Sequence, residues 1–507
     1  MTLPSIIYGL FLLSVVGIYW SLPFKRLRLW VLWVSSLVFY ASLQVQYLPL
    51  MFAIALVTFF LGKALSSPLN WRIPEEQWQA AEQTWDQRRG WILAFGVGLN
   101  VLLLVVFKYL APTLELIGFV AAQNQWLAER DELLSTLIIP LGISFFCFEC
   151  IAYLVDVYRG AKPTQRLVEF AAYKFFFPKL ISGPIVRFHA FLGQFKQQPG
   201  SETDPQGPSP NLTHAVDGLW LIATGSMKKL LIADHIAILV NLSFSNLERA
   251  GSADIWLAIF AYGLQLYFDF SGYVDIARGS AIFLGFNLPQ NFDFPYFSIS
   301  IADFWRRWHM SLGAWLRNYL YFPLGGSRHG LARTCLNLGI VMVIAGAWHG
   351  DNWGFLIWGG LHGLALAGHR LNQAAAVRWS WLERLWQSLP GVLLAWAITQ
   401  AMVFSSWLFF RLPTYRDFSF ALTHLWGYPA DIQFATKVYS ESLGLSSLQV
   451  LIMLIGLVIA SAIAYGFNRG LKLYMGWPLK LLLVPICLFL AWLLAPGESL
   501  PYIYFEF

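Results

Sequence analysis

Apolar segments of near membrane-spanning length recur along most of this 507-residue chain. Crossing about 30 Å of hydrocarbon takes roughly 20 mainly apolar residues, and about ten to twelve segments approach that length. Hydrophobic residues make up 57% of the sequence and charged residues only 12%, whereas a soluble domain carries about 25% charged residues. The chain is therefore predicted to be an all-α, polytopic membrane protein. The predicted spans lie near residues 4–23, 29–44, 47–62, 91–111, 136–156, 215–243, 252–270, 333–349, 352–368, 390–410, 447–466 and 478–495.

The basic residues gather at one set of span ends. Loops rich in Lys and Arg face the cytoplasm, so we predict an outward-facing N-terminus and an outer position for the acidic run at 129–132. The first apolar run has no basic region before it and no small-residue cleavage site, so we interpret it as a retained span. The basic residues that indicate this orientation are Lys25, Arg26, Arg28, Arg88, Arg89, Arg159, Lys162 and Arg166.

One integral-membrane domain is predicted over residues 1–507, because no boundary separates two hydrophobic cores and no internal repeat is present. Two polar insertions are predicted to be exposed. The first is a cytoplasmic connection at 64–90 with a surface helix at 74–88, and the second is a proline-rich loop at 196–211. Cys147 and Cys150 lie in an apolar segment without further ligands, so we interpret both thiols as core residues rather than zinc ligands.

A histidine lies inside one of the apolar segments. His349 follows the apolar run that begins at Val341, and an ionisable side chain at membrane depth costs a few kcal/mol. A hydrogen bond to a neighbouring helix returns only roughly 0.6 kcal/mol. His349 is therefore a candidate functional residue, although the residues alone leave a structural role equally open.

A second histidine, His309, lies in an aromatic and basic segment. Ser300 followed by Asp303 predicts a helix N-terminus, and Arg306 and Arg307 lie off the apolar face of that helix. The apolar face is made of Phe304, Trp308, Leu312, Trp315 and Tyr319. We predict one interfacial or partly inserted helix here. His309 would then line a cavity wall, because irregular backbone at membrane depth is tolerated only where protein or water surrounds it.

Two histidines brought together would suit several kinds of chemistry. An imidazole titrates at about 6.5, so it can take the proton of a hydroxyl that attacks an ester or thioester, and a second polar donor can stabilise the oxyanion. Proton translocation would fit the same pair. A zinc site is disfavoured, because it needs three protein ligands at suitable spacing and the sequence offers no such set.

Asp269 lies in an aromatic stretch at 265–273. Its carboxylate could orient a histidine or pair with an arginine. A structural hydrogen bond or salt bridge between helices is the favoured interpretation.

Ordered sequence blocks between about residues 140 and 370 resemble the membrane-bound O-acyltransferase family. They resemble most the bacterial branch that includes proteins of alginate O-acetylation and of teichoic-acid D-alanylation. The blocks include Trp305-Arg306-Arg307-Trp308-His309 and Trp348-His349-Gly350, and the full set lies at 140–160, 177–187, 267–273, 304–312, 315–326, 347–350 and 358–363. Segments 404–411 and 504–507 add weaker support.

The resemblance implies a fold of helices around a trans-membrane tunnel and an O-acyltransferase activity. It implies that His349 is the catalytic residue and His309 the second essential one, with the division of proton transfer between them left open. Residues expected to support or orient them are Asp269, Arg306, Arg307, Trp308 and Trp348.

The resemblance also implies the substrates and the location. The expected donor is acetyl-CoA or another acyl thioester on the cytoplasmic side, without a metal. The expected acceptor is a polysaccharide, or an extracytoplasmic acetyltransferase that modifies one. The expected location is the bacterial cytoplasmic (inner) membrane.

Three functions remain open from the sequence. The first is O-acetylation of an exported polysaccharide, which the length of the chain favours, since the D-alanyl transferases of the family tend to be shorter. The second is D-alanyl transfer to a teichoic-acid-type polymer. The third is a proton-coupled transporter. This function is disfavoured because transporters often carry internal repeats in hydropathy and the sequence shows none. No basic run is dense enough to predict nucleic-acid binding.

Overall fold

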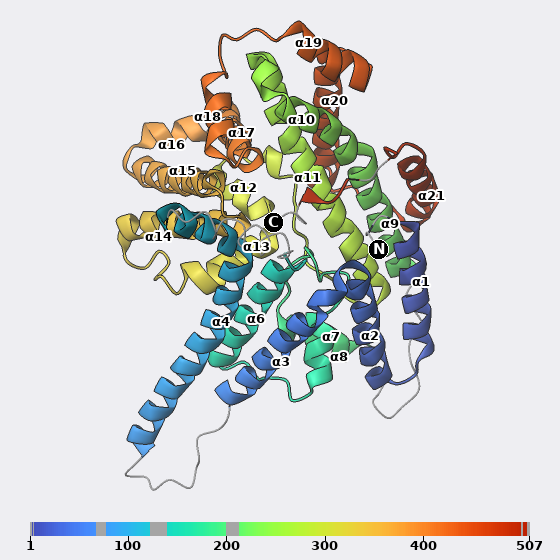
Figure 1. Cartoon of the computed structure of the whole chain (residues 1–507), viewed down its shortest axis with the longest axis vertical. Coiled ribbons are helices and arrows are strands. Elements are labelled where there is room, and N and C mark those ends of the chain that lie inside the picture. Colours follow the sequence, from blue (N-terminus) through green and yellow to red (C-terminus); the bar gives the residue numbers. More distant parts are fainter. Residues whose placement is uncertain are drawn as a thin grey trace. The chain divides into compact units, whose positions relative to one another are not determined.

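The computed structural model describes residues 3, 5–66, 78–121, 139–198, 212–497 and 500–503. Within these ranges the chain is helical and contains no strand, which confirms the predicted all-α class (Figure 1). Predictions for the acidic run at 129–132, for most of the loop at 196–211 and for the segment 504–507 lie outside the described residues.

The chain divides into two compact units. The first comprises Met1–Gly218 and Ala277–Pro289, and the second comprises Leu219–Ile276 and Gln290–Phe507. Two helices therefore contribute to both units. The single domain over 1–507 and the trans-membrane tunnel stay predictions.

The first unit is built from long apolar helices and short connecting ones. Its helices are α1 (Ile6–Ser21), α2 (Lys25–Gln44), the 3-10 turn η1 (Val45–Tyr47), α3 (Leu48–Leu65), α4 (Trp78–Ala121), α6 (Ile143–Tyr158), α7 (Leu167–Lys174), α8 (Phe188–Gln197) and the start of α9 (Leu212–Ser226). Helix α6 packs against α3 and α4. The predicted surface helix at 74–88 is not separate, because residues from Trp78 onward continue into the apolar part of α4. Cys147 and Cys150 are free and buried in α6, which confirms their prediction as core residues.

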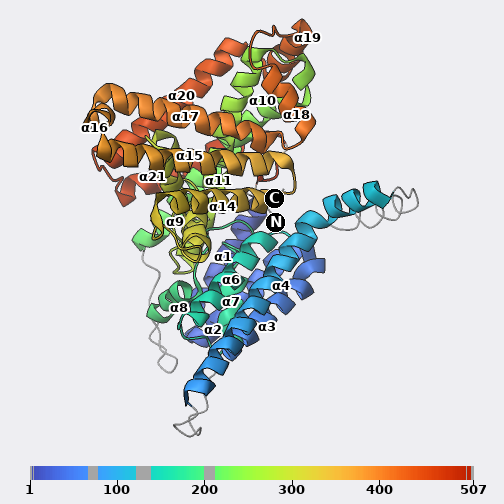
Figure 2. The same cartoon turned by 90° about the vertical axis from the view of Figure 1, so that its left-hand side faces the viewer.

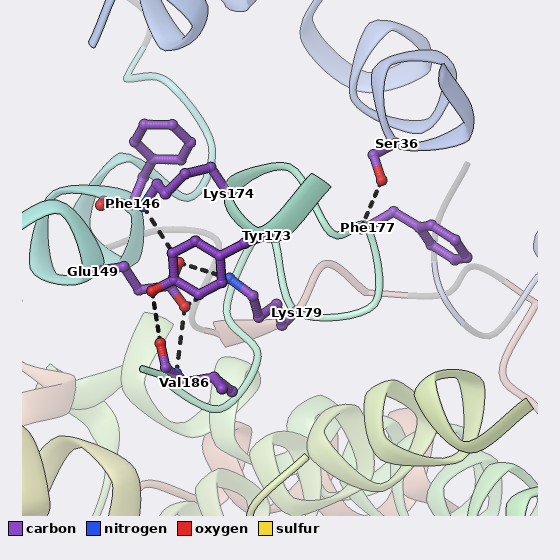
Figure 3. A network of polar contacts seen from close by, with 8 residues as sticks. All are labelled: Ser36, Phe146, Glu149, Tyr173, Lys174, Phe177, Lys179 and Val186. Atoms are coloured by element: carbon purple, nitrogen blue, oxygen red, sulfur yellow. Dashed lines mark hydrogen bonds and ion pairs between the residues drawn. The ribbon is translucent and has the colours of Figure 1, made fainter. Parts of the chain in front are cut away.

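A buried ion cluster joins α6 to the loop that follows α7 (Figure 3). The carboxylate of Glu149 accepts hydrogen bonds from Lys179 Nζ at 2.6 and 2.7 Å, from Lys174 Nζ at 3.3 Å and from the Val186 main-chain N–H at 3.3 Å. Tyr173 donates its hydroxyl to the Val186 carbonyl at 2.7 Å. The three charged side chains are buried, so this part of the unit is held by charge pairing inside an otherwise apolar core.

The second unit contains the remaining helices, together with most of α9 and α11. They are the π-helical turn η3 (Met227–Ala233), α10 (Asp234–Ser245), η4 (Leu247–Arg249), α11 (Ser252–Phe283), η5 (Pro295–Phe297), α12 (Ile301–Arg307), α13 (Met310–Leu316), η6 (Arg317–Tyr321), α14 (Gly330–His349), α15 (Trp353–Arg378), α16 (Ser380–Gln387), α17 (Leu389–Arg411), α18 (Tyr415–Thr423), α19 (Ile432–Ala435), η7 (Thr436–Leu443), α20 (Ser447–Tyr465), η8 (Gly466–Gly470) and α21 (Trp477–Leu493).

Helices α14 and α15 form a closely packed pair, and Figure 2 shows them side by side. A Cβ added at Gly346 would meet the Phe355 carbonyl oxygen, and one added at Gly359 would meet the Met342 carbonyl oxygen. Small residues at such contacts let the backbones of membrane helices approach closely. The pairing carries His349, at the end of α14, against the first turns of α15.

Five helical stretches of the described chain are long and apolar enough to cross a membrane. They are Lys25–Leu65, Ala81–Tyr109, Gly330–His349, Leu389–Arg411 and Ser447–Gly470. The polytopic class is thus confirmed, but the sequence predicted about ten to twelve inserted helices at roughly 20 residues each. The difference arises because other predicted spans are short helices, such as α1 and α21, or are interrupted, as α9 and α10 are by η3.

Candidate active site

The sequence predicted one helix through His309. The structure instead places His309 at a break between two short helices, α12 and α13. The Ser300 side chain caps α12 by accepting from the Asp303 N–H at 3.1 Å, as predicted. Helix α12 then ends at Arg307, Trp308 is extended, and His309 has φ 42° and ψ 54° in the left-handed region. The spacing of apolar residues did not reveal the break, because the predicted apolar face is buried both before His309 (Phe304) and after it (Leu312).

The break places the His309 imidazole in the interior of the second unit. His309 is 1% exposed, and its ring lies edge-on to Phe270 of α11 with centroids 4.9 Å apart. Asn291 holds the main chain on the far side of the break. Its carbonyl accepts from the Met310 N–H at 3.0 Å, and its Oδ1 accepts from the Ser311 N–H at 2.9 Å.

His349 is the last residue of α14 and is 3% exposed. Aromatic rings surround its imidazole, among them Phe355 at 6.4 Å between ring centroids. Trp348 lies at 4.8 Å, Phe410 at 4.9 Å and Trp358 at 5.3 Å between ring centroids. The prediction that His349 is a buried ionisable group inside an apolar segment is therefore confirmed.

One continuous aromatic cluster contains both histidines. From the His309 side, Phe270 contacts Phe292 at 5.1 Å and Phe292 contacts Trp308 at 5.0 Å. Trp308 contacts Trp407 of α17 at 5.1 Å, and Trp407 contacts Trp358 at 6.1 Å, next to His349. The structure thus places both predicted histidines in the same aromatic core of the second unit.

A third buried histidine escaped the sequence analysis. His362 of α15 is 0% exposed, accepts from Trp305 Nε1–H at its Nδ1 (3.2 Å) and lies 3.0 Å from Ser406 Oγ at its Nε2. An indole N–H can only donate, so Nδ1 is unprotonated and Nε2–H donates to Ser406. Trp358 lies 4.8 Å from this ring and also contacts His349. The sequence did carry a signal for this contact: Trp358 and His362 are four residues apart, which places them on the same face of a helix.

Asp269 orients no histidine through the hydrogen bonds that the structure gives it. Its Oδ1 accepts from Lys229 Nζ at 2.7 Å, and its Oδ2 accepts from the Ile503 N–H at 3.0 Å. Lys229 also contacts Asp234 at 2.8 Å. The favoured interpretation of the sequence, a structural hydrogen bond or salt bridge, therefore agrees with the geometry, and the partner is Lys229. Asp269 fixes α11 one residue before Phe270, which contacts His309.

The two arginines before His309 pair with Asp303 on their own helix. Arg307 Nη2 lies 2.9 Å from Asp303 Oδ2, and Arg306 Nη2 lies 3.6 Å from Asp303 Oδ1. The Arg306 side chain is 72% exposed, so it points out of the aromatic core. Arg307 is more enclosed and lies over the ring of Tyr465 at 5.9 Å.

Across the described ranges, no three His, Cys, Asp or Glu side chains gather as a metal site. What the second unit offers instead is imidazole chemistry in a dry aromatic setting. In such a setting a proton transfer or a hydrogen bond to a developing charge acts more strongly than in water.

Fold and site together define a class: a polytopic helical membrane protein with histidines buried in an aromatic core. The family model described as MBOAT, membrane-bound O-acyltransferase family, matches residues 91–407. The chain belongs to this family and is an O-acyltransferase.

Several curated proteins are similar to the chain over much of its length. A probable alginate O-acetylase of Pseudomonas putida is 36% identical over 79% of this chain and 75% of its own. A peptidoglycan O-acetyltransferase of Helicobacter pylori is 34% identical over 76% of this chain and 71% of its own. A teichoic acid D-alanyltransferase of Streptococcus thermophilus is 28% identical over 45% of this chain and 55% of its own.

Proposed function

We propose that the chain transfers an acetyl group from a thioester donor toward an exported polysaccharide. The observation that carries this proposal is the pair of buried histidines, His309 and His349, in an O-acyltransferase. Relatives that match 79% and 76% of this chain are named as a probable alginate O-acetylase and a peptidoglycan O-acetyltransferase. Acetyl-CoA is the proposed donor, because its thioester is an activated acyl group.

The proposed reaction is an attack of a hydroxyl oxygen on the thioester carbonyl carbon. A C–O bond forms and the C–S bond breaks. The hydroxyl proton passes to an imidazole and from there to the leaving thiolate. General-base help of this kind contributes about 10²–10⁴-fold, and a hydrogen-bond donor to the oxyanion contributes further.

We assign the proton transfer to His349 and the hydrogen-bonding role to His309. Burial lowers the pKa of His309 to about 3, so its imidazole is neutral at physiological pH and is a weak base. A neutral imidazole can still donate a hydrogen bond to a developing oxyanion. Trp308 and Trp348 would hold the two rings in place by packing, and Asp269 would act at a distance by fixing α11.

The proposed location is the cytoplasmic (inner) membrane of a bacterium, with the basic span ends inside. The donor would then enter from the cytoplasm along a tunnel between the helices. The acceptor would be the polysaccharide itself or an extracytoplasmic acetyltransferase that passes the acetyl group on. D-alanyl transfer is the alternative, and it has weaker support because two teichoic acid D-alanyltransferases are only 28% and 26% identical, over 45% and 51% of this chain.

The test is the acetate content of the exported polymer. Cells lacking the gene would be complemented with the wild-type protein or with His349→Ala, and alkali-labile acetate would be measured on the purified polymer. We expect wild-type protein to restore acetate and His349→Ala to restore none, at equal protein abundance in the membrane. Unchanged acetate on deletion of the gene would contradict the polysaccharide proposal.

The matched control is His214→Ala, because His214 is an exposed histidine at the start of α9. It should restore acetate as the wild-type protein does. Release of alkali-labile D-alanine instead of acetate would favour the D-alanyl alternative. Normal acetylation by His349→Ala would refute the role given to that imidazole.

A further inference from the structure

We propose that Asn291 is a positioning residue for His309, acting through its side-chain oxygen on the first turn of α13. This inference rests on the proposed function, because it concerns how one of the two histidines is held in place. Asn291 lies before α12 in the sequence. It accepts hydrogen bonds from the main chain of Met310 and Ser311, so its effect on the imidazole would pass through the main chain.

The start of α13 is capped by Asn291 rather than by the residue that precedes the helix. An N-cap side chain usually accepts from the first free N–H groups of its helix. His309 holds the N-cap position but makes no side-chain capping bond. Instead the Met310 N–H donates to the Asn291 carbonyl at 3.0 Å and the Ser311 N–H donates to Asn291 Oδ1 at 2.9 Å.

The cap of α13 is therefore formed without the His309 side chain. A residue in the left-handed region is strained unless its neighbours hold it there. The two bonds to Asn291 hold Met310 and Ser311, directly after His309. The Asp293 N–H donates to the carbonyl of Arg307, two residues before His309, at 3.0 Å. Segment 291–293 thus lies against both sides of the break and determines where the imidazole points.

Asn291 is itself placed in the same core. It is 0% exposed, and the next residue, Phe292, contacts both Phe270 and Trp308. Within the part of the chain that the structure describes, Asn291 Nδ2 has no hydrogen-bond partner. The hydrogen bond that joins this buried side chain to the break is made by its oxygen, so the acceptor is the atom to test.

Two substitutions separate the acceptor from the size of the side chain. Asn291→Leu has a similar volume but cannot accept from the Ser311 N–H. Asn291→Asp keeps an oxygen at the Oδ1 position and removes the amide donors. A matched control is Asn337→Leu, since Asn337 is also buried and also fastens a main-chain segment, donating to the Leu324 and Gly326 carbonyls at 3.2 and 2.9 Å.

The experiment measures kcat and KM for acetyl-CoA with purified, monodisperse protein in proteoliposomes. We expect Asn291→Leu to lower kcat by about 10- to 100-fold with KM within about twofold, because small misplacements of a catalytic group have effects of this size. Asn291→Asp should recover kcat to within about fivefold of wild type, and Asn337→Leu should keep it within about twofold.

The outcomes distinguish this inference from the proposed function. If wild-type protein transfers no acetyl group, the proposed function fails. If wild type is active and His309→Ala is inactive, but Asn291→Leu turns over at the wild-type rate, only the inference fails. An Asn291→Asp variant as slow as Asn291→Leu would also overturn it, as would an equal loss in Asn337→Leu. Where the leucine variant does not accumulate, Asn291→Ala takes its place with the same expectation.

Discussion

At the scale of single residues, the main chain at His309 matters as much as its side chain. Its φ of 42° places a non-glycine residue in the left-handed region, which costs roughly 1–2 kcal/mol for an L-amino acid. The fold retains this strain at a buried imidazole, and strain of this kind tends to persist where surrounding structure and function require it.

A pair of substitutions separates backbone strain from chemistry. His309→Ala and His309→Gly both remove the imidazole, but only glycine adopts the left-handed region freely. We expect both variants to lose at least about 10²-fold in kcat, with the glycine variant about 1 kcal/mol more stable than the alanine variant. Turnover and apparent melting temperature in detergent check this. Wild-type turnover in His309→Gly would show that the imidazole is dispensable.

The sequence predicted several residues of the site but not their conformations. The Ser300 cap and the burial of His349 followed from local pattern and from hydropathy. The left-handed turn at His309 did not, because one residue of reversed backbone leaves the apolar spacing on either side intact. The burial of His362 depends on which face of α15 meets α12 and α17, and that is a property of the packed helices.

At the scale of elements, the contact between α14 and α15 depends on glycine. Gly359 faces the Met342 carbonyl and Gly363 lies close to Gly339, where an added Cβ would come within 2.9 Å of the Gly339 Cα. The same pairing carries Trp358 against both His349 and His362. Separation of the two helices would therefore move the rings that surround both imidazoles.

Neighbouring glycines on α15 provide a test with an internal control. Gly359→Ala should destabilise the protein by about 1–3 kcal/mol, as overpacking does, and should lower acetyl transfer. Gly360→Ala should be neutral or slightly stabilising, because its Cβ would meet nothing within 4 Å and alanine favours helix over glycine. The measurements are the apparent melting temperature and the initial rate of each variant. Equal melting temperatures and rates for Gly359→Ala and Gly360→Ala would contradict a contact that depends on glycine.

At the scale of the whole molecule, each unit carries a buried charge cluster that hydropathy alone does not reveal. In the first unit Glu149 binds two lysines, and in the second Lys229 binds Asp234 and Asp269. The sequence predicted the helical, polytopic class because composition and segment length determine it. Five described helical stretches reach the length and hydropathy of a span, and several of the other predicted spans are shorter or interrupted helices.

The cluster in the first unit gives a prediction about stability. Burial lowers the pKa of Lys179 to about 8, and attraction to Glu149 opposes that shift. Glu149→Gln leaves two buried lysines without a carboxylate, and we expect a loss of about 3–5 kcal/mol. Lys179→Met leaves a balanced pair of Glu149 and Lys174 and should cost much less. Thermal unfolding in detergent measures both, and a less stable Lys179→Met would contradict this account.

The left-handed turn at His309 also has a consequence for molecular evolution. Beside histidine, the residues that tolerate this backbone best are glycine, asparagine and aspartate. Substitutions of His309 are therefore expected to be mostly glycine, asparagine or aspartate, because the main-chain conformation limits them independently of the chemistry. His349 ends a regular helix and has no such restriction of its main chain. Relatives that changed their acyl acceptor or lost activity should consequently show a narrow range of residues at the position of His309 and a wide range at the position of His349.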